Sequence, residues 1–155
     1  MDQIDGDILG ILESQARISY KDLAEKVALS ANSVAERVRR MHEQGVIRRF
    51  SAEIDPAAFD LTLQALIEVK MESATTAELF QARAAATTGV VRALVTTGRY
   101  DWVLEVNARD HNDLQRIIEA LRAGNLVRDT YTSVIVSDKR FPLIERTRCV
   151  SGAAR

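Results

Sequence analysis

Residues 18–41 of this 155-residue chain contain two short helical patterns separated by a break, and no other segment limits the possible folds so strongly. Ser19 can cap the first helix, because its hydroxyl can accept a hydrogen bond from an unpaired backbone N–H group and Asp22 can reach back. Ser30 can cap the second helix in the same way. The periodicity predicts one buried stripe on each helix, formed by Leu23, Ala24 and Val27 on the first and by Val34, Val38 and Met41 on the second.

The opposite face of the second helix, Ser30 to Met41, is polar and positively charged. It carries Asn32, Ser33, Glu36, Arg37 and Arg40, with Arg39 on its flank. Asparagine can pair with adenine and arginine with guanine or phosphate, and the major groove of DNA admits a helix. We therefore expect a helix-turn-helix that docks on duplex DNA. An ordinary helical hairpin with a solvated face fits these residues equally well.

The net charge of the chain is −1, so no global positive field draws it to nucleic acid. The charge is unevenly distributed, because five arginines and only one acid, Glu43, lie between residues 37 and 49. Two of these arginines, Arg48 and Arg49, follow the second helix directly. Charges act over a Debye length of roughly 8 Å, so a neutral total does not argue against DNA binding. A solvated run of arginines is the alternative interpretation.

The composition, 46% hydrophobic and 28% charged, is that of a folded soluble protein. The single cysteine, Cys149, cannot form an intrachain disulfide, and with only His42 and His111 it provides no ligand set for structural zinc. No signal peptide is recognisable, and no segment approaches the roughly 20 apolar residues that cross a bilayer. We expect a reduced cytoplasmic protein, associated with the nucleoid, with no metal, cofactor or membrane contact.

The N-terminal residues predict a third helix, capped by Asp2 and Asp5 and ending near Gln15. Its apolar face would be formed by Ile4, Ile8, Ile11 and Leu12. Three helices in about 40 residues can bury these faces only by packing on one another. We therefore expect a helix-turn-helix domain over residues 1–45, with Gly45 as a left-handed C-cap.

Residues 46–61 are predicted to form a strand followed by a linker. The strand would cover residues 46–54, with Val46, Phe50, Ala52 and Ile54 on one side and Arg49, Ser51 and Glu53 on the other. Asp55–Pro56 ends it, and residues 57–61 would be a linker or a single turn.

Residues 62–138 alternate between strand and helix patterns. The expected elements are a strand up to Met71, a helix opened by a Thr75–Glu78 capping box and closed by Gly89, strands at 90–97 and 100–107 joined by a tight turn at Gly98–Arg99, a helix from Asp110 and Asp113 to Gly124, and a strand at 126–137. The order β-α-β-β-α-β is the ferredoxin-like unit, an antiparallel sheet with both helices on one side. The predicted fold class is therefore α+β.

The other side of that sheet would carry a cluster of large apolar residues: Leu66, Leu94, Val103 and Ile135. A monomer rarely leaves such a patch exposed, so we expect a homodimer, although scattered exposed apolar residues are a normal alternative. Residues 139–155 form a C-terminal tail whose small and charged residues suggest partial disorder. Phe141, Leu143 and Ile144 could instead dock on a neighbour.

Several segments together resemble the Lrp/AsnC (leucine-responsive, feast/famine) family of transcriptional regulators. They are MDQIDGDILGILESQARIS, LAEKVALS, RVRRMHEQGVIRRFSAEIDP, TTGRYDWVLEV and DTYTSVIV, in the family's order and spacing. The resemblance implies a winged-helix-like helix-turn-helix domain followed by a ferredoxin-like domain for ligand binding and oligomerisation. It also implies dimers that assemble into tetramers, octamers or larger species, and transcription control by a small effector, usually an amino acid.

The resemblance assigns DNA contacts to the second helix of the pair. Base or phosphate contacts are expected from Ser30, Asn32, Ser33, Glu36, Arg37 and Arg40, and backbone contacts from Arg39, Arg48 and Arg49. Glu36 could accept from cytosine or orient Arg40 one turn later.

An effector is expected at contacts between dimers, near Gly98, Arg99, Tyr100, Asp101, Thr130 and Thr132. Backbone amides at the glycine turn can hold a carboxylate and Asp101 an ammonium group, although the same residues also suit an ordinary turn. Arg99 departs from the acid common at that position in the family, so an acidic effector is one possibility.

Two other functions fit parts of the sequence. Sirohaem decarboxylases resemble this family in both domains, but they depend on histidines in the second half of the chain, where this sequence has only His111 beside the capping Asp110. No Cys–His or Ser–His–Asp arrangement is recognisable, so we do not expect an enzyme. A ligand-sensing module that no longer binds DNA is the third alternative, and the arginine cluster argues against it.

Overall fold

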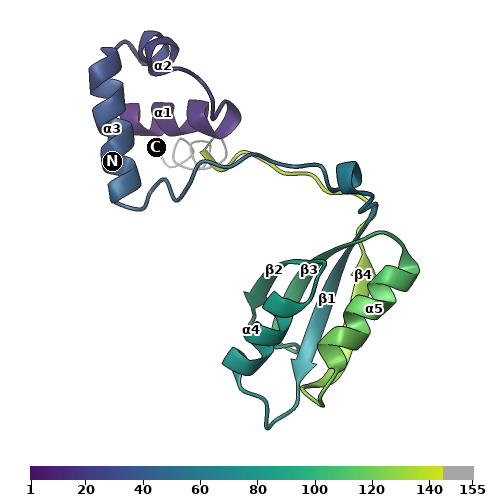
Figure 1. Cartoon of the computed structure of the whole chain (residues 1–155). Coiled ribbons are helices and arrows are strands. Elements are labelled where there is room, and N and C mark those ends of the chain that lie inside the picture. Colours follow the sequence, from purple (N-terminus) through teal and green to yellow (C-terminus); the bar gives the residue numbers. More distant parts are fainter. Residues whose placement is uncertain (145–155) are drawn as a thin grey trace, which may run out of the picture. The chain divides into compact units, whose positions relative to one another are not determined.

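The computed structural model describes residues 1–144, which divide into two compact units (Figure 1). One unit contains Met1–Glu53 and the described residues from Lys139 onward, and the other contains Ile54–Asp138. The division differs from the expected segment limits, because residues 46–53 and 139–144 group with the helices and residues 54–61 with the sheet. Within residues 1–144, no helix is both long and apolar enough to span a bilayer.

The N-terminal unit consists of α1 (Gln3–Ser14), α2 (Tyr20–Val27) and α3 (Ala31–Glu43). Each helix begins at a predicted cap: the side chains of Asp2, Ser19 and Ser30 accept hydrogen bonds from the third backbone N–H group that follows them. The core of this unit is formed by Ile8, Leu12, Leu23, Ala24, Val34, Val38, Met41 and Ile47. The predicted helices and their buried stripes are thus confirmed.

The strand predicted at residues 46–54 was wrong, because this segment has no regular secondary structure. Val46, Phe50 and Ile54 are exposed, while Ile47, on the opposite side of the expected strand, is the residue that packs into the helical core. The backbone N–H groups of Val46 and Ile47 both donate to the Met41 carbonyl. These bonds end α3, and among the described residues no strand pairs with the segment to form a ladder.

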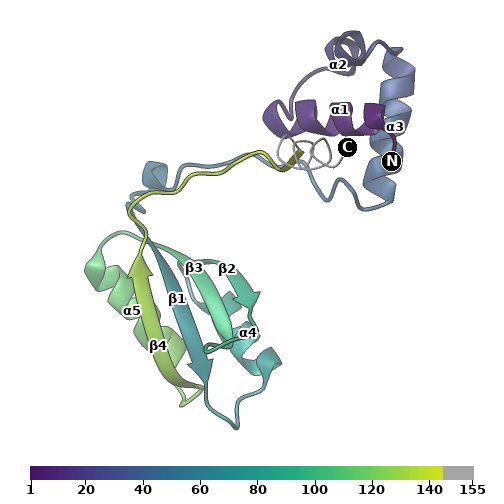
Figure 2. The same ribbon diagram turned by 180° about the vertical axis from the view of Figure 1, so that it is seen from behind.

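The second unit begins with η1 (Pro56–Phe59), the predicted single turn, which Asp55 caps. It continues with β1 (Leu63–Met71), α4 (Ala77–Ala86), β2 (Val90–Val95), β3 (Trp102–Ala108), α5 (His111–Arg122) and β4 (Val127–Val134). The strands form one antiparallel sheet in the order β2-β3-β1-β4. Both helices cover the same face of the sheet, as Figures 1 and 2 show from opposite sides. The ferredoxin-like β-α-β-β-α-β order is confirmed.

The core of the second unit lies between the sheet and these helices. Alternate residues of β1 and β3 are buried, as the period of a strand requires. They pack against Phe80 of α4 and against Leu114, Ile117 and Leu121 of α5. Phe80 and Trp102 form a tilted aromatic pair with ring centroids 5.4 Å apart. The stripe of α5 formed by Leu114, Ile117 and Leu121 is therefore in the core.

Two local predictions in this unit were wrong. Thr76, not Thr75, caps α4, because the Thr75 hydroxyl donates instead to the Leu126 carbonyl. The connection from β2 to β3 is a loop over residues 96–101 rather than a two-residue turn. Thr96 closes this loop, with its hydroxyl donating to the Tyr100 carbonyl and its N–H to the Asp101 carbonyl. These hydrogen bonds replace the strand pairing that the sequence pattern predicted beside Gly98–Arg99.

The face of the sheet away from the helices is mixed in polarity. Leu94 pairs with Val103 across β2 and β3, and Leu66 pairs with Glu105 across β1 and β3. Leu66, Leu94, Val103 and Ile135 are all half-buried. The expected apolar cluster is thus interrupted by Glu105, which pairs with Arg92 at 3.0 Å. Dimer formation through this face stays a prediction.

The start of the C-terminal tail contacts the N-terminal unit. The Glu13 carboxylate at the end of α1 accepts hydrogen bonds from the backbone N–H groups of Leu143 and Ile144, at 2.7 and 3.0 Å. The Ile144 side chain lies against Gly10, and Arg140 pairs with Glu53 at 3.2 Å. Leu143 and Ile144 therefore dock on their own chain. The prediction of disorder falls largely on residues 145–155, which lie outside the described part of the structure.

Gly89, between α4 and β2, should be the least replaceable glycine of the sheet unit. Its φ is +99°, and a Cβ atom there would lie 2.5 Å from Ile117 Cδ1 and 2.9 Å from the Asn107 carbonyl oxygen. Gly89→Ala should therefore lower the free energy of unfolding by at least about 2 kcal/mol, from backbone strain and overpacking together.

The matched control for Gly89 is Gly124→Ala, at φ +79°, where a Cβ would meet only Arg83 Nη2 at 3.6 Å. It should lose only about 1 kcal/mol, from backbone strain alone. Urea unfolding of the full chain measures both losses. Equal losses would show that the contact with Ile117 and Asn107 is unimportant.

Candidate DNA-binding and effector-binding sites

The outer face of α3 is exposed, as the helical period predicts. Val34, Val38 and Met41 are buried, and the remaining positions point away from the core. The exposed residues include Asn32, Ser33, Glu36, Arg39 and Arg40. A helix anchored along one stripe presents its opposite face to solvent, where a DNA groove can reach it.

The first turn of α3 contains a serine pair and a separate amide. The hydroxyls of Ser30 and Ser33 lie 2.8 Å apart, and the Ser33 N–H donates to Ser30 Oγ at 3.1 Å. Ser30 is therefore a structural cap, whose hydroxyl is already hydrogen-bonded. No side-chain hydrogen bond is formed by Asn32 within residues 1–144, so its amide can pair with a base edge.

Arg37 and Arg40 turn toward the N-terminus of α1, a contact that sequence analysis missed. Arg37 Nη1 donates to Asp2 Oδ2 at 2.7 Å and to Asp5 Oδ1 at 2.8 Å. Arg40 Nη2 donates to both carboxylate oxygens of Asp5, at 3.1 Å each. The Arg37 side chain keeps 23% of its surface exposed and that of Arg40 47%. Arg37 is thus held by two carboxylates and mostly covered, whereas Arg40 remains accessible.

Asp5 is a buried carboxylate, with only 2% of its side chain exposed. Burial by itself would raise its pKa, but the hydrogen bonds from the Asp2 N–H and the Arg37 guanidinium outweigh burial and hold the pKa below its ordinary value. Asp5 is therefore ionised at neutral pH. A buried carboxylate stays ionised only when positive partners or hydrogen-bond donors surround it. Sequence analysis predicted Asp2 and Asp5 only as caps of the first helix, and the two residues do form a capping box there.

Arg39 forms ion pairs along its own helix, with Glu36 and Glu43. The hydrogen bond from Arg39 lowers the pKa of Glu36, and the same contact raises the pKa of Arg39. Glu36 pairs with Arg39 and not with Arg40, so the suggestion that Glu36 orients Arg40 was wrong. Spacing alone could not decide between the two pairs, since residues three and four apart on a helix are both neighbours, and Arg40 is bound to Asp5 instead.

Arg48 and Arg49 lie just after α3 in the irregular segment and are exposed. Neither forms an ion pair with another described residue. Their guanidinium groups are thus available for phosphate, although the strand that was expected to present them is absent. Their role in DNA binding stays a prediction.

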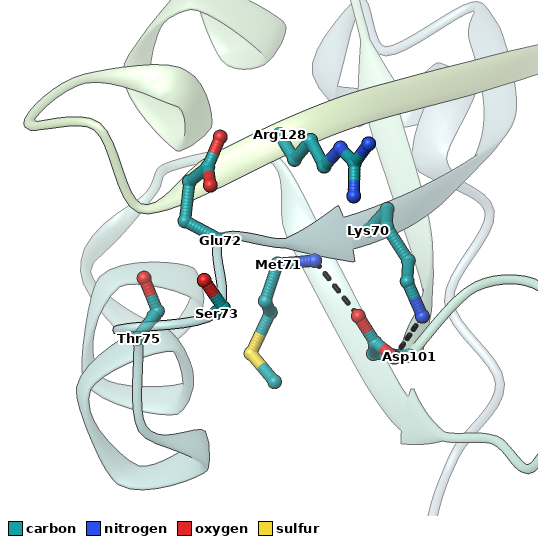
Figure 3. Close-up of a pocket in the computed structure, with 7 residues that line it drawn as sticks. All are labelled: Lys70, Met71, Glu72, Ser73, Thr75, Asp101 and Arg128. Carbon is teal, nitrogen blue, oxygen red and sulfur yellow. Dashed lines mark hydrogen bonds and ion pairs between the residues drawn. The ribbon is translucent and has the colours of Figure 1, made fainter.

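Asp101, the residue expected to hold an effector's ammonium group, is engaged within the chain. Its Oδ1 accepts from Lys70 Nζ at 2.7 Å and its Oδ2 from the Met71 N–H at 2.8 Å (Figure 3). The bond from Lys70, followed by that from Met71, lowers the pKa of Asp101. The backbone N–H of Asp101 donates to the Val69 carbonyl. Asp101 therefore ties the 96–101 loop to the end of β1, and any ligand contact must be additional.

A shallow pocket of about 350 Å³ lies beside Asp101. It is lined by Lys70, Met71, Glu72, Ser73, Thr75, Asp101 and Arg128, which Figure 3 shows around the end of β1 and the start of β4. Arg128 forms no ion pair within the described residues, so its guanidinium is available to an anion. Sequence analysis missed Lys70 and Arg128, although Lys70 contacts the predicted Asp101 and Arg128 lies two residues before the predicted Thr130 on β4.

The remaining residues expected at the effector site do not line this pocket. Gly98 is exposed with open space around it, and the Arg99 guanidinium lies 5.6 Å from the centre of the Tyr100 ring. Thr130 and Thr132 pair with Val69 and Ile67 of β1 and are half-buried. These two threonines share the side of the sheet that faces the helices, because cross-strand partners point the same way. The structure thus brings only Asp101 of the six into the pocket.

Family models match both units. Residues 1–48 match a winged helix-turn-helix DNA-binding model, and residues 64–142 match the Lrp/AsnC ligand binding domain. The regulator AldR of Mycolicibacterium smegmatis is 39% identical over 143 residues, which cover 90% of this chain and 84% of that protein. The chain belongs to the Lrp/AsnC family of transcriptional regulators. The regulator FL11 of Pyrococcus horikoshii is 27% identical over 136 residues, covering 88% of this chain and 89% of FL11.

Solved structures of Lrp/AsnC regulators share the fold. A transcriptional regulator of Neisseria meningitidis, in complex with L-methionine, has a TM-score of 0.85 at 27% identity, covering 92% of this chain and 94% of that chain. Escherichia coli AsnC has a TM-score of 0.81 at 24% identity, covering 91% and 95% of the two chains, and supports the fold alone.

These relatives confirm the predicted family and α+β fold class, and they establish a DNA-binding regulator with a ligand-binding domain rather than an enzyme. The sirohaem decarboxylase alternative therefore has no support among them.

Asp101 should stabilise the sheet unit through its charge. Because the pKa of Asp101 is lowered in the folded state, its stabilisation is present above the ordinary carboxyl pKa and is lost as the pH falls through the lowered value. Asp101→Asn should cost about 1 kcal/mol at pH 7, since the ion pair with Lys70 is partly exposed and screened. The deficit should shrink below about pH 4.

Urea unfolding of the full chain at a series of pH values measures this deficit. Asp129→Asn is the control, because the Asp129 carboxylate is exposed and, within residues 1–144, accepts only from the adjacent Thr130 N–H. A deficit for Asp101→Asn that does not change with pH would contradict the assigned role.

Proposed function

We propose that the protein binds operator duplexes in a sequence-specific manner through the exposed face of α3, and that an amino acid bound to the second unit modulates this binding. The observation that carries the proposal is the division of α3 into a fully buried stripe and an exposed polar face with Asn32 and Arg40. A buried amide and guanidinium would have been incompatible with groove binding. The match of the second unit to a ligand-binding domain supports the effector.

Base reading would come from the N-terminal half of α3. The Asn32 amide can form two hydrogen bonds with adenine, and Ser33 can contact either a base or a phosphate. Arg40 would bind guanine or phosphate from the next turns of the helix. Arg39, Arg48 and Arg49 would contact the sugar-phosphate backbone and Arg37 would contribute less, because two carboxylates already hold it.

A dimer would present two copies of α3 to successive major grooves about one helical turn apart. The face of the sheet with Leu66, Leu94 and Val103 supports dimerisation, because these half-buried residues would be covered in such a contact. Assembly of dimers into tetramers, octamers or larger species would add avidity and allow DNA bending.

The effector chemistry follows from the charges near the 96–101 loop. An α-amino acid carries a carboxylate and an ammonium group, which need donors and acceptors close together. Arg128 and Lys70 supply donors beside the pocket, and Glu72 supplies an acceptor. Gly98, Arg99 and Tyr100 would complete the site from a neighbouring dimer, whereas Thr130 and Thr132, which face the helices of their own unit, would contribute less. The Neisseria regulator bound to L-methionine supports an amino acid as the ligand class.

Replacing Arg40 or Asn32 by alanine should weaken operator binding. Each change removes a direct contact and should cost about 1–3 kcal/mol of binding free energy. The measurement is fluorescence anisotropy on a duplex selected from a random-sequence pool, at a fixed salt concentration. Arg122→Ala, which removes an exposed arginine at the end of α5, is the charge-matched control. Wild-type affinity in both α3 variants would place the DNA interface elsewhere.

An amino acid that binds should raise the melting temperature of the protein, because it binds only the native state. A screen of the twenty amino acids by differential scanning fluorimetry identifies it. Arg128→Ala should abolish the shift, since it removes the unpaired guanidinium that would hold the carboxylate, whereas Arg122→Ala should leave it intact. Stabilisation of Arg128→Ala equal to that of the wild type would exclude this pocket.

A further inference from the structure

Asp5 connects the first helix of the N-terminal unit to the helix proposed to bind DNA. Its buried side chain accepts four hydrogen bonds: one from the Asp2 N–H at 3.0 Å, one from Arg37 at 2.8 Å and two from Arg40 at 3.1 Å. A buried carboxylate needs such partners, and removing a partner is costly. Asp5 therefore fixes both guanidinium groups in place.

Arg37 and Arg40 differ in how accessible their guanidinium groups are to DNA. Arg37 Nη1 bridges two carboxylates, and less than a quarter of the Arg37 side chain is exposed. Arg40 uses only Nη2 in this cluster, and almost half of its side chain is exposed. Each guanidinium has five N–H donors in a rigid plane and uses one terminal nitrogen here, so the two arginines differ in exposure, and Arg40 is the more accessible. Arg40 can bind Asp5 with one end and DNA with the other.

We propose that Asp5 is a positioning residue for DNA binding, which retains Arg37 as a structural cation against α1 and holds Arg40 in one orientation toward the duplex. This inference rests on the proposed α3 interface. Holding Arg40 before DNA arrives reduces the side-chain entropy lost on binding. Positioning Arg40 should increase the affinity for operator sequences more than the affinity for other duplexes, because base contacts depend on geometry whereas non-specific binding depends mainly on charge.

The charge balance of the cluster implies that Asp5 weakens non-specific binding, whereas its positioning of Arg40 favours operator binding. Asp2, Asp5, Arg37 and Arg40 together carry no net charge, so Asp5 cancels positive potential beside the DNA-binding face. Removing the Asp5 charge should strengthen binding to any duplex and loosen Arg40 at the same time. The ratio of operator affinity to non-specific affinity should therefore fall. A purely structural role would lower stability without changing that ratio in the folded protein.

The test compares Asp5→Asn with Asp2→Asn in the full chain. Both variants remove one negative charge, one carboxylate of the capping box and one contact with Arg37, but only Asp5 holds Arg40. Affinities are measured for a duplex selected from a random-sequence pool and for a scrambled duplex of the same composition, over a range of salt. Asp5→Asn should lower the affinity ratio by about tenfold, the effect of one well-placed contact. Asp2→Asn should leave the ratio close to that of the wild type. An unchanged ratio in Asp5→Asn, or an equal fall in both variants, would overturn the inference.

A second measurement needs no variant, in case Asp5→Asn does not fold. In ¹⁵N NMR spectra of the wild-type chain, adding the selected duplex should shift the Arg40 guanidinium signals clearly more than those of Arg37. Equal shifts for the two arginines, or none for Arg40, would contradict the assignment.

The Arg40→Ala and Asn32→Ala variants separate the two proposals. Normal binding by both would refute the α3 interface itself. Weakened binding by them, combined with an unchanged affinity ratio in Asp5→Asn, would refute only the role of Asp5.

Discussion

The complete burial of Val34, Val38 and Met41 along one side of α3 is the constraint on which the N-terminal unit depends. These three side chains lie in the core with Ile8 and Leu23 and set the rotation of α3 about its own axis. Rotation by even one residue would bury a polar side chain without a partner, which costs far more than it gains. The same burial that stabilises the unit therefore decides which residues DNA can meet.

In the second unit, one face of the sheet is buried and the other is not. β1 pairs with β3 on one side and β4 on the other, and its residues Ala65, Ile67 and Val69 are completely buried beneath the helices. On the opposite face, Leu66, Leu94 and Val103 are only half-buried, so a partner could cover them. Asp101 joins the 96–101 loop to β1 at one end of this sheet. A ligand that competes for Lys70 or for the loop amides would thus act on the central strand directly.

Short-range physics made most of the fold predictable from sequence. Caps such as Ser30 and stripes such as that of α3 depend on residues three or four apart, which a single sequence displays. The strand at residues 46–54 failed because alternation does not show whether a pairing strand exists. The contacts of Arg37 and Arg40 with Asp5 span more than thirty residues, so no local pattern could predict them. The exposed positions of α3 were predictable, but not which of its arginines were already paired.

Three arginines of α3 are paired with carboxylates before DNA is present: Arg37 and Arg40 with Asp5, and Arg39 with Glu36 and Glu43. A helix with unpaired arginines would bind any duplex through counterion release alone. The existing ion pairs reduce the free energy that these arginines gain on binding DNA, because DNA must offer contacts that compete with those pairs or add to them. In the proposed complex, a net charge of −1 and an α3 whose arginines are already paired with carboxylates would favour discrimination between sequences over general affinity. In the proposed complex, the exposed Arg48 and Arg49 would supply the attraction to the DNA backbone that such a helix lacks.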